Sequence, residues 1–462
     1  MRATIAEGRK PVMFYAIAFS IFCAVCTVLA FTRHPIYGLY FYMATTYVHP
    51  PSRWWASLLP DMRWALLSAV VTVLAIVFHR GKLSSRPLWL ATGAAAILSV
   101  YALWMWIQTP WALDLEEHID GSVLFVKYML AFWFIYRVTD SKELIRNFLF
   151  THALGCGLFG FLARFSDREA GRVEGVGGPG LDDANSLGMF LGTGAIVCLG
   201  LLLTQKGWRR WLAQILLPAI LEGFVAANSR GAFLGLIAGT VVVVFTMARS
   251  HRRVFWVVAV VAGLFAGIAA DKMFVERMFT IGDVAAQGEE GDMSARSRTA
   301  IVEAQLHMAR DYPMGVGHRG TVPLSPLYLE RKWLVGGGAD PNAGRSSHNT
   351  FLTTLVEQGV IGAIIFVTLV AWLFRAIVRV RRMDRRGVDP EISTLGGTMC
   401  AAIVVVLVAG AATDYLLAEI QFWMFAGLAS LLALEASRRT TATTGEAHTS
   451  ARGDLGKPAT SP

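Results

Sequence analysis

Charged residues are scarce in this sequence. Only 16% of its 462 residues are Asp, Glu, Lys or Arg, whereas about 25% is usual in a soluble protein. Hydrophobic residues make up 55% of the chain, and apolar runs recur from residue 12 to residue 434. A water-soluble, disordered or collagen-like protein is therefore excluded. The composition predicts a membrane protein.

Cysteine is also scarce, with five residues in all. Each lies inside an apolar run, which indicates small buried side chains and excludes a secreted disulfide framework. Cys23 and Cys26 have the C-x-x-C spacing, but no strand precedes them and no redox context surrounds them. Metal-binding patterns are missing too, because the sequence shows no Asp-x-Asp motif and no His/Cys cluster on either side of the membrane.

Apolar runs near the length that crosses a bilayer, about 20 residues, predict 12 or 13 spans. We therefore expect an all-α fold, a polytopic transmembrane helical bundle with a large, partly helical extracytoplasmic loop. The run 36–49 is short and could be broken or fused with its neighbour. The predicted spans lie near residues 12–31, 36–49, 63–79, 87–108, 121–138, 144–163, 186–204, 211–228, 231–248, 254–270, 350–374, 393–412 and 415–434.

Lys and Arg residues fall in alternate short loops, which the positive-inside rule assigns to the cytoplasm. The formal net charge of +9 is thus explained by anchors that face anionic lipid headgroups, and nucleic acid is not an expected partner. The same alternation places 271–349 outside. It also places the N-terminus outside if 36–49 crosses, which conflicts with the basic residues Arg2, Arg9 and Lys10.

The chain divides into five predicted regions. They are N-terminal transmembrane helices (1–163), central helices with Gly/Arg loops at the outer face (164–270), a large periplasmic loop (271–349), C-terminal helices (350–436) and a disordered cytoplasmic tail (437–462).

Two of the outer stretches carry polar candidates. The first, 164–185, contains Arg172, a glycine-rich run and Asn185, and it is either an ordinary turn or a binding loop. The second contains Arg230 between two apolar helices, where an unpaired arginine is costly. Snorkelling to headgroups explains it equally well. Glu222, two turns earlier, is an intramembrane carboxylate for which Arg230 or another exported arginine is the expected partner.

The large loop carries more arginines than the outer side of a membrane protein usually holds. Arg298 lies on a predicted helix that ends before Pro313, and Arg319 follows a glycine-rich turn. The loop closes on His348 and Asn349. Asn349 can cap the next helix, whereas His348 is either a structural hydrogen-bonding group or a general base.

Four short motifs, in this order and spacing, resemble those of the O-antigen ligase and polymerase superfamily of bacterial envelope glycosyltransferases, most closely its ligase branch, which includes exosortase-associated O-glycosylation ligases. The resemblance covers about residues 165–375. Its pieces are Gly178-Pro179 with Asp183-Ala184-Asn185, Ser229-Arg230-Gly231, Arg298 with Pro313, Gly315 and Gly317, and His348-Asn349 with Glu357 and Gly359.

This resemblance implies a GT-C-like, multi-pass glycosyltransferase of the bacterial inner membrane with its active site facing the periplasm. It implies metal-independent, inverting transfer of a glycan from an undecaprenyl-diphosphate carrier to an acceptor hydroxyl of a glycan, lipid A-core or protein. The roles implied are diphosphate binding for Arg230 and Arg298 and general base for His348. No cofactor is expected. Arg172, Asn185, Arg319 and Asn349 are expected to bind substrate, with Glu222 and Glu357 in support, although Glu357 lies nine residues beyond His348, too far along the chain for an expected direct contact.

Other functions stay open at this point. A polymerase or a protein O-oligosaccharyltransferase of the same superfamily fits the same motifs, and the sugar, the acceptor and the oligomeric state do not follow from the sequence. A lipid-linked sugar flippase or exporter is the alternative from a different class. Such a transporter should spread its polar residues through both leaflets, whereas here they gather at one face.

Overall fold

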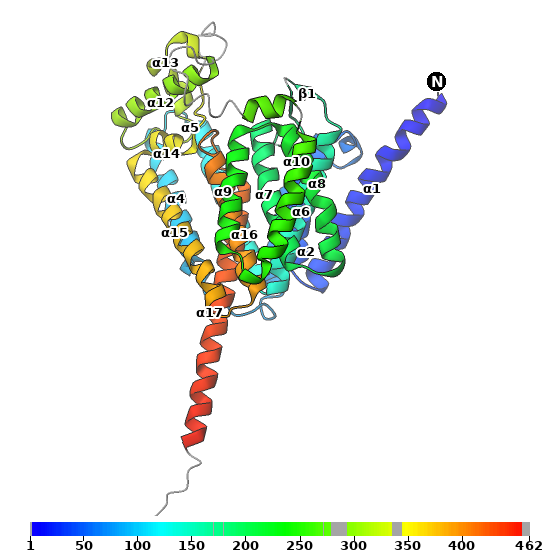
Figure 1. Ribbon diagram of the computed structural model, residues 1–462. Helices are drawn as coiled ribbons and strands as arrows, with labels where there is room; N and C mark the ends of the chain where they lie inside the picture. The colour runs from blue at the N-terminus through cyan, green and yellow to red at the C-terminus, as the bar shows by residue number, and fades with distance from the viewer. Residues whose placement is uncertain are drawn as a thin grey trace, which may run out of the picture.

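A computed structural model describes residues 2–169, 171–178, 180–270, 272–278, 293–334 and 344–454, with side chains left out at 2–12, 169, 293–298 and 439–454. Within these ranges the fold is a bundle of long α-helices, and the all-α prediction is confirmed (Figure 1). Nine described helices are long and apolar enough to cross a membrane, and two shorter apolar ones accompany them.

Every predicted span contains helix. The α-helices are α1 (Arg2–Thr32), α2 (Ile36–Val48), α3 (Trp64–Phe78), α4 (Gly93–Gln108), α5 (Leu115–Val138), α6 (Lys142–Arg164), α7 (Ala184–Thr204), α8 (Gly207–Ala227), α9 (Arg230–Thr246), α10 (Arg252–Ala269), α12 (Met293–Asp311), α13 (Thr321–Tyr328), α14 (Thr350–Glu357), α15 (Gly359–Arg385), α16 (Pro390–Ala409) and α17 (Glu419–Asp454).

Short elements fill some of the connections. Residues 272–278 are also helical, and two-residue strands β1 (Arg168–Glu169) and β2 (Arg172–Val173) pair antiparallel before α7. The 3-10 turns are η1 (Pro50–Ser52), η2 (Ala56–Leu58), η3 (Trp89–Ala91), η4 (Thr109–Trp111), η5 (Arg249–His251) and η6 (Arg331–Trp333).

The bundle has two ends that differ in chemistry. We call the end that carries α12, α13 and α14 the loop end (Figure 1), and the opposite end, with the loops rich in Lys and Arg, the basic end. The chain begins at the loop end in Figure 1. His34, just before α2, lies near Asp140 and His79 at the basic end, while His49, just after α2, packs on Gly178 at the loop end. The short helix α2 therefore runs from one end of the bundle to the other.

The core forms around α7 and α16. In the most apolar stretch of α7, 94% of the residues are buried inside the protein, whereas only 6% are buried in the corresponding stretch that includes α10 at the edge of the bundle. Small residues permit close approach, as membrane helices require. A Cβ on Gly223 of α8, for instance, would lie 2.7 Å from the Cα of Gly160 on α6. The closely packed central helices thus support the residues at the loop end.

Two boundaries differ from the sequence prediction. The span predicted at 350–374 is two helices, α14 and α15, separated at Gln358 and Gly359, because Gly359 has a left-handed φ of 65°. The tail 437–462, expected to be disordered, continues α17 as helix to Asp454, and 455–462 lie outside the described residues. The stretch 440–447 contains four threonines and a glycine, which disfavour helix, beside two alanines and a glutamate, which favour it.

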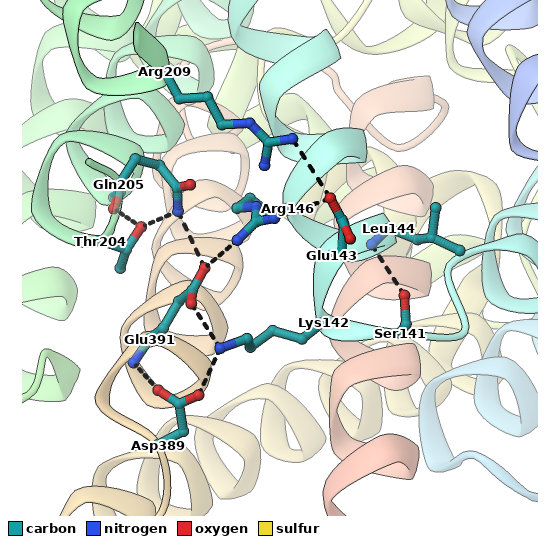
Figure 2. A network of polar contacts seen from close by, with 11 residues as sticks. Ser141, Lys142, Glu143, Leu144, Arg146, Thr204, Gln205, Arg209, Asp389 and Glu391 are labelled. Carbon is teal, nitrogen blue, oxygen red and sulfur yellow. Dashed lines mark hydrogen bonds and ion pairs between the residues drawn. The ribbon is translucent and has the colours of Figure 1, made fainter. Parts of the chain in front are cut away.

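Ion pairs close the basic end (Figure 2). Lys142 Nζ of α6 lies 2.7 Å from Asp389 Oδ2 and 2.8 Å from Glu391 Oε2. Glu391, at the start of α16, also contacts Arg146 Nη1 at 3.4 Å and accepts a hydrogen bond from Gln205 Nε2 at 3.1 Å. A single carboxylate therefore joins α6, α16 and the connection between α7 and α8.

Replacing that carboxylate should loosen the basic end. We expect Glu391→Gln to cost ~1–2 kcal/mol, because Lys142 and Arg146 lose a charged partner in a half-buried setting. For a chain of 462 residues, this corresponds to a decrease of about 1–2 °C in the midpoint of thermal unfolding in detergent. The exposed Glu303→Gln on α12 is the matched control. An unchanged midpoint in both variants would show that the network does not stabilise the bundle.

Candidate functional site

The connection between α16 and α17, residues 410–415, is the place where the motif segments meet. Thr350, the first residue of α14, donates its N–H to Gly410 O at 2.7 Å and its hydroxyl to Thr413 O at 3.0 Å. The N–H of Tyr415 in turn donates to the Thr350 hydroxyl at 2.8 Å. These three bonds fix the start of α14, and with it His348 and Asn349, against the connection.

The Ser229-Arg230-Gly231 motif reaches the same connection from another side. Ser229 caps α9, and its hydroxyl accepts from the N–H of Ala232 at 3.4 Å. A Cβ on Gly231 would lie 3.0 Å from the Cβ of Ala412, so glycine allows α9 to approach this closely. Arg230 is half-buried, and no described residue makes a hydrogen bond or ion pair with its guanidinium.

The loop before α7 supplies a second arginine. Arg172 Nη2 donates to Asn185 Oδ1 at 2.8 Å, and the Ser229 hydroxyl donates to the same oxygen at 3.0 Å. Asp183 caps α7 by accepting from the N–H groups of Asn185 and Ser186. Asn185 thus joins Arg172 to the motif that carries Arg230. Pro179 lies outside the described residues.

Two motifs that are forty residues apart form one backbone structure. Val316 and Gly317 donate their N–H groups to the carbonyls of Val356 (3.2 Å) and Glu357 (2.9 Å), and Val360 N–H donates to Pro313 O at 2.9 Å. Gly315 and Gly317 both have left-handed φ, of 83° and 84°. The glycines let the turn after Pro313 pair with the break between α14 and α15.

This pairing places His318 beside Glu357. His318 Nδ1 lies 3.4 Å from Glu357 Oε2, and both side chains are almost fully buried. The N–H of His318 donates to His118 Nδ1 at 2.8 Å, which fixes the turn against α5. Burial lowers the pKa of the His318 imidazole, but the carboxylates of Glu357 and Asp414 outweigh it, and the net direction is upward. Glu357 therefore contacts His318. From the sequence, we expected it to play a supporting role near His348.

A cavity of about 520 Å³ opens beside His318. Its lining contains apolar side chains, among them Leu124, Met189, Phe190 and Ile420, as well as polar ones. Glu117, Asp120, Asp414 and Glu419 contribute carboxylates, and Arg319 contributes one guanidinium that lies 3.5 Å from Glu117. The remaining described lining residues are Thr46, Gly121, Tyr128, Gly180, Leu181, Ser186, His318, Tyr415, Leu417, Ala418 and Trp423.

Asp414 joins the cavity to the 410–415 connection. Burial raises its pKa to about 6, and the nearby carboxylate of Glu357 acts in the same direction, whereas Leu416 N–H, His318 and Arg319 act against it. Next to it, Tyr415 lies beside Ser186, Asp183 and Arg172. Tyr415 therefore lines the cavity and also lies near Arg172. We call Arg172 and Arg230 the arginine cluster, because Asn185 links Arg172 to Ser229, the residue before Arg230.

The remaining predicted residues take the following positions. His348 is exposed just before α14, and Asn349 caps that helix, since its Oδ1 accepts from the N–H groups of Phe351 (2.9 Å) and Leu352 (3.2 Å). Glu222 forms an ion pair with Arg164 of α6, the other exported arginine rather than Arg230. Arg298 falls on α12, but its side chain lies outside the described residues.

Sequence reasoning missed His318, Asp414 and the cavity carboxylates. An aspartate in the short connection between the last two apolar runs was the available signal, because a carboxylate so close to two spans is costly unless it is used. Within the described residues, no group of three His, Cys, Asp or Glu side chains is arranged to hold a metal ion.

Comparison with known proteins identifies the segment that carries these motifs. Residues 215–367 match the family model of the O-antigen ligase. This match supports the O-antigen ligase superfamily for the segment that carries the motifs. The matched segment includes Ser229-Arg230-Gly231, the Pro313 to His318 turn, and His348 through Gly359, while Arg172, Asn185 and Asp414 lie beyond it.

A curated relative agrees with this family. The chain is 27% identical over 226 residues to the exopolysaccharide production protein ExoQ of Rhizobium meliloti (strain 1021). The match covers 46% of this chain and 47% of ExoQ, so the chain spans about half the length of this relative. The superfamily of ligases and polymerases that the motifs resemble is thus supported by both similarities.

The glycine break can be tested by substitution. A Cβ on Gly315 would lie 2.5 Å from Glu357 O, and Gly359 has a left-handed φ. We expect Gly315→Ala and Gly359→Ala each to cost at least about 2 kcal/mol and to reduce folded yield. Gly263→Ala on α10, where a Cβ meets no atom within 4 Å, should be neutral. Wild-type yield and thermal stability in all three variants would contradict the pairing of the two motifs.

Proposed function

We propose that this protein is a membrane glycosyltransferase that moves a glycan from an undecaprenyl-diphosphate carrier to an acceptor hydroxyl. The observation that carries the proposal is the convergence of the family's motif segments on residues 410–415, next to a cavity at the loop end. A lipid-linked donor would reach such a site from the bilayer. We place the protein in the bacterial inner membrane, with the loop end in the periplasm.

The arginine cluster suits the diphosphate of the donor. Guanidinium groups bind phosphate oxygens in forked geometry and stabilise the negative charge that develops on the leaving group. Arg230 has no described protein partner, and the guanidinium of Arg172 is oriented by Asn185. Arg298 is proposed to contribute from α12, as in the family.

His348 is the proposed general base. Its imidazole would take the proton of the acceptor hydroxyl while that oxygen forms a bond with the anomeric carbon. The bond from this carbon to the diphosphate oxygen breaks at the same time. The lipid diphosphate then departs as an anion whose charge the arginines stabilise. A single displacement of this kind inverts the configuration at the anomeric carbon.

A polymerase is the second candidate. It uses the same chemistry, but its acceptor is itself a lipid-linked glycan. The similarity to a protein named for exopolysaccharide production favours it, while the motif pattern resembles the ligase branch.

Transfer by purified protein tests the proposal. In detergent, wild-type protein with an undecaprenyl-diphosphate-linked glycan and a panel of acceptors should form product, which a flippase could not do. We expect His348→Ala and Arg230→Ala each to lower the rate at least about 100-fold. Each removes a group that acts in the transition state.

Matched controls are His307→Ala and Arg310→Ala, exposed residues of α12, which should transfer glycan at the wild-type rate. Folding of every variant is checked by gel filtration and thermal unfolding. Product formation at the wild-type rate by both site variants would overturn the proposed roles, and absence of product with the whole acceptor panel would overturn the transferase proposal.

A further inference from the structure

The charge of the cavity is opposite to what a diphosphate requires. Four carboxylates and one guanidinium line its described wall, and that guanidinium already faces Glu117. Like charges a few ångströms apart repel by several kcal/mol at a protein surface, so the lipid diphosphate is expected to avoid this space. Arg172 of the arginine cluster lies near Tyr415, which lines the cavity, but neither Arg172 nor Arg230 is among the described lining residues.

We propose that the acidic cavity is the acceptor subsite, in which Asp414 binds hydroxyl groups of the acceptor sugar. This inference rests on the proposed function and deepens it, because it names the place and the chemistry of the second substrate. The acceptor recognised here is a neutral, hydroxyl-rich sugar.

The lining of the cavity suits such a sugar. Its volume of about 520 Å³ falls in the range of about 300–1,000 Å³ that small-molecule sites occupy. Carboxylates accept hydrogen bonds from hydroxyl groups strongly, and the half-buried Tyr128 adds an aromatic side chain to the lining. The Glu419 carboxylate is held in place, since Tyr42 Oη donates to its Oε1 at 2.5 Å and Trp423 Nε1 donates to it at 3.0 Å.

A buried imidazole at the cavity wall is an independent sign of a ligand site. His318 is 9% exposed, yet its Nδ1 has no well-aligned hydrogen bond and Nε2 has no partner among the described residues. A Cβ on Gly121 of α5 would overlap the ring, so glycine there makes room for it. The fold thus places at the cavity a buried imidazole that faces Glu357 without a well-aligned hydrogen bond and lies near Asp414.

Asp414 should bind hydroxyl groups best as a carboxylate. The charged and titratable groups around it are Glu357, His318 and Arg319, with Glu117, Asp120, Glu419 and Tyr415 along the cavity. Its pKa is raised to about 6, so the ionised form is complete at pH 7.5 and is lost as the pH falls through 6. The KM for the acceptor should therefore rise below pH 6.

The test is steady-state transfer by the purified full-length protein, with donor and acceptor varied separately between pH 5 and 8. We expect Asp414→Asn to raise the acceptor KM about tenfold at pH 7.5, to leave the donor KM unchanged, and to abolish the rise below pH 6. His318→Gln should raise the acceptor KM too. Asp61→Asn, an exposed residue at the loop end, is the control and should match the wild type.

The outcomes separate the two proposals. An Asp414→Asn protein with wild-type acceptor KM and the same pH profile overturns the acceptor subsite while the transferase remains. A rise in the donor KM alone also overturns it and assigns the cavity to the donor. If the wild type forms no product, the proposed function fails instead. Thermal unfolding of Asp414→Asn and His318→Gln identifies a folding defect. Binding of the acceptor alone is then measured by microscale thermophoresis on the variant that is folded, and an affinity equal to that of the wild type overturns the acceptor subsite.

Discussion

The hydrogen bonds between Thr350 and the 410–415 connection are the constraint on which the site depends. They hold the start of α14 against the end of α16, where the start of α9 also packs through Gly231. Segments that are far apart in the chain are thereby brought within one small region at the loop end. The packed helices α7 and α16 keep that region rigid, which a site that must align two substrates requires.

The pairing of 313–318 with 356–360 gives the second part of the site its shape. Without the left-handed glycines, α14 and α15 would continue as one helix and the turn before His318 would have no partner. The break turns Glu357 toward His318 and away from His348. Gly315, Gly317 and Gly359 are therefore explained by backbone conformation and close approach.

Much of the fold could be predicted from the sequence, because apolar length and loop charge are local properties. The positions of the long apolar helices, the cap at Asn349 and the grouping of the motifs at one end followed from them. The partners did not, since Glu222 with Arg164, Glu357 with His318 and the surroundings of Asp414 depend on which helices pack together. The break at Gly359 was missed because the apolar run continues through it.

Two groups of opposite charge at the loop end, the arginine cluster and the cavity carboxylates, give the proposed mechanism its direction. Cations on one side suit a leaving diphosphate, and carboxylates on the other suit the hydroxyl groups of an acceptor. A sugar bound in the cavity would present one hydroxyl group to the donor. The diphosphate of the donor would stay outside the cavity. This division also accounts for the mixture of arginines and acidic residues in the loops of one end.

The convergence on residues 410–415 is tested most directly by a disulfide crosslink between Gly231→Cys and Ala412→Cys. A Cβ at position 231 would lie 3.0 Å from that of Ala412, close to the roughly 3.5–4.5 Å of a disulfide, and the five native cysteines are buried. Mass spectrometry of oxidised, purified protein should find the 231 and 412 peptides joined, and a control pair at 231 and 263 should stay separate. If both cysteines of the first pair alkylate readily and no crosslink forms in folded protein, the convergence is contradicted.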